Sequence, residues 1–157
     1  MRDAQTGAAV EWLAAVAPDP LGCRRAWDDN PFRTLLLPAG TRWDVLLVPG
    51  RLGYPAFDAL ARRVERPGPV LADVGGTRVG FFVPPATGEH WVGTGVRCAG
   101  AGTWVVVPRP GHAADGTRWL VPPDGSGTLN EPSVLEDALH EAAAGLAAAR
   151  GLRRTEA

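Results

Sequence analysis

The sequence predicts an α/β (α+β) domain built on a mixed β-sheet with an RRM-like βαβ core, and three observations support this. Short apolar segments rich in valine alternate with turn residues, which is typical of strands. A helical apolar period lies between two of these segments and makes a strand–helix–strand unit. The 15 prolines and 20 glycines fall between the segments and favour short elements with tight connections. We expect helices mainly on one face and the C-terminal helix over a sheet edge.

Two helices are expected before the first strand. Thr6 can cap a helix that ends near Val16. Asp19 followed by Pro20 is a start signal for a second helix, which ends near Asp28.

The βαβ unit comes next. After a short strand over 34–37, the segment 43–48 (WDVLLV) indicates a strand buried on both faces. Residues 52–64 have the apolar period of a helix, and 70–74 is a second strand. A right-handed crossover would make the strands 43–48 and 70–74 a parallel pair.

Later strands should extend this sheet. Gly75 and Gly76 signal a tight hairpin that returns the chain as an antiparallel strand over 78–83, which makes the sheet mixed. Strands over 103–107 and 117–121 are expected to face each other across a loop containing Pro, Gly and His.

A long helix should close the domain. It is expected from Pro132 to about Arg150, with Gly151 just past its end. The prediction is a single domain over 1–152 and a frayed tail over 153–157.

The composition limits the function. All 16 basic residues are arginine, a bias typical of a GC-rich bacterial genome, and the net charge is −1. Proteins that neutralise many phosphates are usually basic, so the charge argues against strong general binding of nucleic acid. We find neither a signal peptide nor an apolar run of roughly 20 residues that could span a bilayer. We therefore expect a cytoplasmic protein with no membrane partner.

Motifs for common catalytic and metal sites are missing. Cys23 and Cys98 fit no metal spacing and are expected to be free, partly buried thiols. His90 and His140 are not grouped with cysteines or carboxylates at ligand spacing. The chain has neither a GxSxG elbow nor a GxGxxG followed by a helix. We expect no metal, no cofactor and no catalytic residue.

Tryptophans and arginines form the candidate binding site, because aromatic rings can stack on bases while arginines pair with phosphates. Trp91 belongs to this group. Alternatively the tryptophans fill the core, with Trp104 and Trp119 as a cross-strand pair. His112 can contact a ligand or order its own loop through a hydrogen bond. The candidate ligand-binding residues are Arg78, Arg97, Trp104, Arg109, His112 and Arg118.

Four segments in order add a family resemblance. They are DPLGCRRAWDDNP, a helix that ends at an Asn-Pro step; TLLLPAGTRWDVLLVP, a pair of strands; ADVGGTRVGFFVPP, a Gly-Gly hairpin; and GVRCAGAGTWVVVPRPGHAADGTRW, a strand-turn-strand. Over residues 19–123 they resemble the N-terminal domain of bifunctional DNA primase/polymerases, of the archaeo-eukaryotic primase superfamily. The resemblance requires the WDVLLV and WVVV strands to share one sheet.

The resemblance also implies that catalysis has been lost. Polymerases of this class bind two divalent metals through carboxylates. The family's Asp-x-Asp corresponds to Leu47 and Pro49, its histidine to Val79 and its final acidic residue to Arg97. None of these side chains can hold a metal ion, and a cation at Arg97 would repel Mg²⁺.

Three functions are therefore considered. The first is a catalytically inactive primase/polymerase-like domain that binds a nucleotide, single-stranded nucleic acid or a protein partner in a cleft between the Arg97 and Arg78 strands. The second is a small protein-interaction or structural subunit, which can be a homodimer. The third is an active polymerase with displaced ligands such as Asp44 and Asp73, although Asp44 can equally be a strand-end residue bonded to backbone or to an arginine. An arginine-lined open cleft favours the first, and a continuous apolar patch favours the second.

Overall fold

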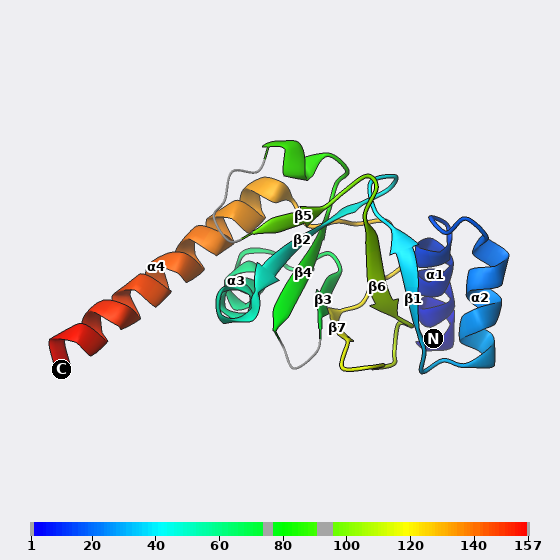
Figure 1. Ribbon diagram of the computed structural model, residues 1–157, viewed down its shortest axis with the longest axis horizontal. Helices are drawn as coiled ribbons and strands as arrows, with labels where there is room; N and C mark the ends of the chain where they lie inside the picture. The colour runs from blue at the N-terminus through cyan, green and yellow to red at the C-terminus, as the bar shows by residue number, and fades with distance from the viewer. Residues whose placement is uncertain (1, 74–76, 91–95, 157) are drawn as a thin grey trace.

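The computed structural model describes residues 2–73, 77–90 and 96–156, and these form an α+β fold, as predicted (Figure 1). In chain order the elements are α1 (Arg2–Ala14), α2 (Pro20–Asp29), β1 (Thr34–Pro38), β2 (Asp44–Pro49), α3 (Gly50–Arg63), β3 (Val70–Ala72), β4 (Arg78–Val83), the 3₁₀ helix η2 (Thr87–His90), β5 (Arg97–Ala99), β6 (Trp104–Pro108), β7 (Arg118–Val121) and α4 (Pro132–Glu156).

The larger sheet has five strands in the order β5-β2-β4-β3-β7, and all of its pairings are antiparallel. The expected parallel pairing of the 43–48 and 70–74 strands is therefore wrong. β2 and β3 do run in the same direction, but β4 lies between them and pairs with both. The result is a split βαβ unit, which is the RRM-like core that the sequence predicts. Since Val79 to Val83 are all buried, β4 needs the central place, where both of its faces are covered.

The hairpin before β4 is confirmed by its strands. β3 and β4 pair in antiparallel register, with Ala72 opposite Val79. The predicted turn residues Gly75 and Gly76 lie outside the described residues.

A second sheet contains only β1 and β6 among the described strands. The predicted pairing of the 103–107 and 117–121 strands is wrong, since β6 pairs with β1 and β7 pairs with β3. The requirement that the WDVLLV and WVVV strands share a sheet is not met either. Burial explains the separation. Alternate residues of β6, Val105 and Val107, are buried, and they pack with α1 and α2 rather than on the α3 face of the larger sheet.

The larger sheet is covered on both faces (Figure 1). On one face, α3 and α4 enclose a core with Leu46, Val70 and Phe81. On the other, Val45 and Phe82 pack with β1, β6, α1 and α2. Thus α3 and α4 share a face, while α1 and α2 lie beyond the small sheet. α4 packs chiefly along α3. The sequence predicted that this helix would cover an edge of the sheet.

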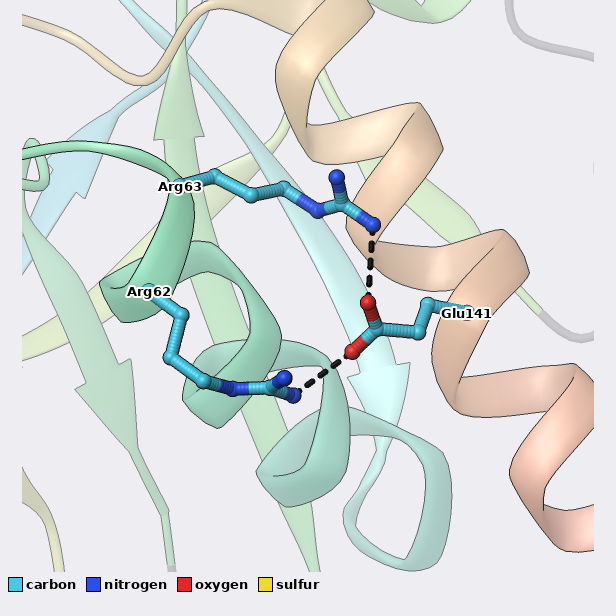
Figure 2. Close-up of polar contacts among 3 residues, drawn as sticks. All are labelled: Arg62, Arg63 and Glu141. Atoms are coloured by element: carbon cyan, nitrogen blue, oxygen red, sulfur yellow. Dashed lines mark hydrogen bonds and ion pairs between the residues drawn. The ribbon is translucent and has the colours of Figure 1, made fainter.

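Two polar features attach α4 and the segment before it. Glu141 of α4 accepts hydrogen bonds from Arg62 (2.6 Å) and Arg63 (2.9 Å) at the end of α3 (Figure 2). Asn130, just before α4, is buried and bonds to the backbone of Gly68, Pro69 and Phe82. Together they hold the helix to the sheet and to α3.

Helix ends show both successes and errors of prediction. Asp19 caps α2 as predicted, with Oδ1 accepting from the Gly22 amide at 3.0 Å. α1 begins at Arg2 rather than at Thr6. α4 continues through Gly151 to Glu156, so the predicted end of the helix near Arg150 is wrong. Alanine, leucine and arginine around Gly151 favour helix strongly enough to offset the roughly 1 kcal/mol that one glycine costs.

The C-terminal part of α4 extends away from the rest of the molecule (Figure 1). Its buried residues end at Ala142, and the residues from Ala143 to Leu152 are exposed or only half-buried.

Candidate functional site

A cleft of about 560 Å³ separates the larger sheet from the small sheet. This volume lies within the roughly 300–1,000 Å³ of small-molecule sites. Its lining consists of Leu47, Leu71, Asp73, Arg78, Gly80, Arg97, Cys98, Ala99, Thr103, Trp104, Val105, Val106, Asp115 and Thr117.

Strand register explains which side chains reach the cleft. Leu47 lies opposite Gly80 on β4 and opposite Arg97 on β5, so these three positions share one face of the larger sheet. Val79 is one residue away and therefore lies on the other face, packed against α3. The resemblance predicts that Val79 stands at a lost catalytic position, but Val79 points away from the cleft. Leu47 and Arg97, by contrast, line it.

Arg78 is an arginine of the cleft with an acidic partner. Its Nε and Nη2 donate to Asp73 Oδ2 at 2.9 and 2.8 Å. Asp73 Oδ1 accepts from the Thr77 hydroxyl and from the Arg78 amide, both at 3.0 Å. Asp73 is thus occupied by the residues around its own turn, and it neutralises Arg78.

Arg97 is the second arginine of the cleft, and it differs from Arg78. Its side chain is exposed and makes no hydrogen bond or ion pair with any described residue. Trp104 of the small sheet also lines the cleft and is 50% exposed. A free guanidinium and an accessible indole therefore face the same space. Such a pair can hold an anionic group and a flat apolar ring.

The structure separates the other candidates from this cleft. Arg109 and His112 lie in the loop after β6, where Arg109 Nη1 is 3.4 Å from His112 Nδ1, and the His112 ring packs edge-on against Phe32. These contacts favour the interpretation that His112 orders its loop. Arg118 of β7 is exposed and outside the cleft lining. Trp91 lies outside the described residues.

Trp119 has a structural role. It packs against Phe82, with 5.4 Å between ring centroids, and its Nε1 donates to the Pro108 carbonyl at 2.9 Å. Since Trp104 belongs to the other sheet, the predicted Trp104–Trp119 cross-strand pair is wrong.

The sequence interpretation missed Asp115, which also lines the cleft. It lies at φ +53° in a tight turn closed by the Ala114–Thr117 bridge. The Asp115-Gly116 dipeptide is a common signal for such a turn and could have placed this carboxylate.

Asp44 is buried behind the cleft and bonds to backbone. It is 3% exposed, and its Oδ2 accepts from the Ala86 amide at 2.9 Å and lies 3.7 Å from Cys98 Sγ. Oδ1 has no partner among the described residues. Burial raises the pKa of the Asp44 carboxyl and, together with the nearby Asp44 charge, raises the pKa of Cys98 to about 11. The Cys98 thiol is therefore protonated at neutral pH.

The stability of Asp44→Asn relative to the wild type should increase as the pH rises. The folded-state pKa of Asp44 lies above its ordinary value of 3.8, so its favourable contribution is complete below pH 3.8 and is lost as the pH rises through the raised pKa. Asparagine does not titrate. Urea unfolding between about pH 4 and about pH 7 should show the variant gaining on the wild type. If the difference in free energy of unfolding between the variant and the wild type did not change with pH, the raised pKa of Asp44 would be contradicted.

No described group of three or more His, Cys, Asp or Glu residues is placed to hold a metal ion. Within the same residues, no helix is both long enough and apolar enough to cross a membrane. Compared with models of protein families, with curated proteins and with solved structures, the chain gives no match.

Proposed function

We propose that this chain is a non-catalytic domain that binds a nucleotide or a short stretch of nucleic acid in the cleft between its two sheets. The observation that carries the proposal is that half-exposed Trp104 lines the same cleft as Arg97, whose side chain is unpaired among the described residues. Phosphate pairing and base stacking need this combination of side chains.

The residues of the cleft also support a binding role without metal catalysis. Leu47 occupies the position for which the resemblance implies an acidic metal ligand, and the oxygens of Asp73 are already bonded to Thr77 and Arg78. β6 belongs to a separate sheet, so the condition that the resemblance sets for these strands is not met. The proposal therefore rests on the cleft itself and not on the family.

The test is binding by the purified full chain. Nucleotides and short single-stranded oligonucleotides are titrated by calorimetry across a salt series from about 50 to about 500 mM, since a phosphate contact must weaken as salt rises. Arg97→Gln should weaken binding about tenfold or more, because a hydrogen bond to a charged group contributes about 1.5–3 kcal/mol. Arg25→Gln, an exposed arginine on α2, is the matched control and should bind like the wild type.

The alternative is a protein-interaction subunit, and one observation favours it. Leu36, Trp104 and Val106 are about half exposed on the same face of the small sheet. Absence of nucleotide and oligonucleotide binding at low salt would contradict the first function and favour this one.

A further inference from the structure

We propose that the cleft is built for one phosphate group, so that its ligand is a nucleoside monophosphate rather than a nucleoside triphosphate or a nucleic-acid strand. This inference rests on the proposed function and narrows it to a class of ligand.

The charges of the cleft lead to this conclusion. Its lining contains two arginines and two aspartates, so its formal charge is zero. Arg78 is already bound through two nitrogens to Asp73. Arg97 is the other arginine of the lining, and its side chain makes no hydrogen bond or ion pair with any described residue. A guanidinium pairs with one phosphate through two parallel hydrogen bonds, which matches a single phosphate group.

Additional phosphates would meet no further unpaired cation of the lining among the described residues. Arg78 already offsets the charge of Asp73, whereas the Asp115 carboxylate lines the cleft and makes no hydrogen bond or ion pair with any described residue. Like charges in a partly enclosed site repel each other more strongly than in bulk water. The net charge of the whole chain, −1, supplies no attraction for a polyanion either.

The rest of the lining suits one base. Leu47, Leu71 and Val106 are apolar, and Trp104 offers a ring for stacking. Gly80, opposite Leu47, adds backbone and no side chain to the lining. Apolar walls with a few polar groups are typical of sites for small ligands.

The test compares charge states of one ligand on the purified full chain. The four ribonucleosides, their 5′-monophosphates, their 5′-triphosphates and a thymidine decanucleotide are titrated by calorimetry at low salt. For the preferred base, the monophosphate should bind about tenfold or more tighter than the nucleoside, and the triphosphate no tighter than the monophosphate.

Two variants assign the effect to residues. Arg97→Gln should lower monophosphate affinity to that of the nucleoside and leave nucleoside binding unchanged. Asp115→Asn should raise triphosphate affinity severalfold, and asparagine tolerates the positive φ at this position. Arg25→Gln again serves as the control.

The outcomes are distinguishable. A triphosphate or decanucleotide that binds tenfold tighter than the monophosphate overturns this inference and leaves nucleotide binding intact. Equal affinity for nucleoside and monophosphate overturns the phosphate contact at Arg97. No binding of any of these ligands overturns the proposed function itself.

Discussion

Asn130→Asp should destabilise the domain by about 3–5 kcal/mol, because two buried hydrogen bonds are lost and one oxygen of a buried carboxylate then faces two carbonyl oxygens without a donor. Asn130 is 3% exposed. Its Oδ1 accepts from the Gly68 amide at 2.8 Å, and its Nδ2 donates to the carbonyls of Pro69 and Phe82 at 3.0 Å each. Aspartate has nearly the same shape but turns an acceptor toward those two carbonyl oxygens.

The matched control is Asn30→Asp. Asn30 is exposed, and its Oδ1 accepts from the Phe32 amide at 3.1 Å, a bond that aspartate retains. The free energy of unfolding of the Asn30→Asp variant, measured in urea, should differ from that of the wild type by less than about 0.5 kcal/mol. Similar losses in the two variants would contradict a buried, fully bonded Asn130.

Gly53→Ala should cost about 1–3 kcal/mol, since it overpacks the contact between α3 and the sheet. A Cβ at position 53 would lie 2.7 Å from both Cβ and Cγ2 of Val79, and 3.3 Å from the Val48 carbonyl oxygen. Val79 is fully buried and cannot turn away, so α3 has to shift.

Gly145→Ala is the matched control and should have the opposite sign. This glycine is also helical, but nothing lies within 4 Å of a Cβ built on it. Alanine in a helix is favoured over glycine by about 0.5–1 kcal/mol. Thermal unfolding of both variants measures the two effects. Stabilisation by Gly53→Ala would show that α3 does not lie this close to β4.

Local signals in the sequence were sufficient for much of the fold. The cap at Asp19, the apolar period of α3 and the β3–β4 hairpin each depend on residues close together in the chain. Strand order was harder to predict. Whether β4 lies outside β2 and β3 or between them is decided by burial on both faces, a property of the assembled layers. The same holds for β6, which pairs with a strand about 70 residues earlier.

Of the predicted ligand-binding residues, Arg78, Arg97 and Trp104 line one cleft. That they bind a ligand stays a prediction. Val79 was misplaced because its register sets it opposite Val48 and not Leu47. In a strand, a shift of one residue exchanges the two faces, and sequence alone did not fix that register. Asn130 was missed because its three backbone partners come from segments far from it in the chain.

The pairing pattern has a consequence for how the chain assembles during synthesis. β1 and β2 are both made before α3, but the partner of β1 is β6, and the partners of β2 are β4 and β5. When the ribosome has released the chain only as far as Arg63, neither of these two strands has its native neighbour. Closing such long loops delays the formation of both sheets. The apolar strands β1 and β2 therefore stay unpaired until the strands that follow α3 have been synthesised.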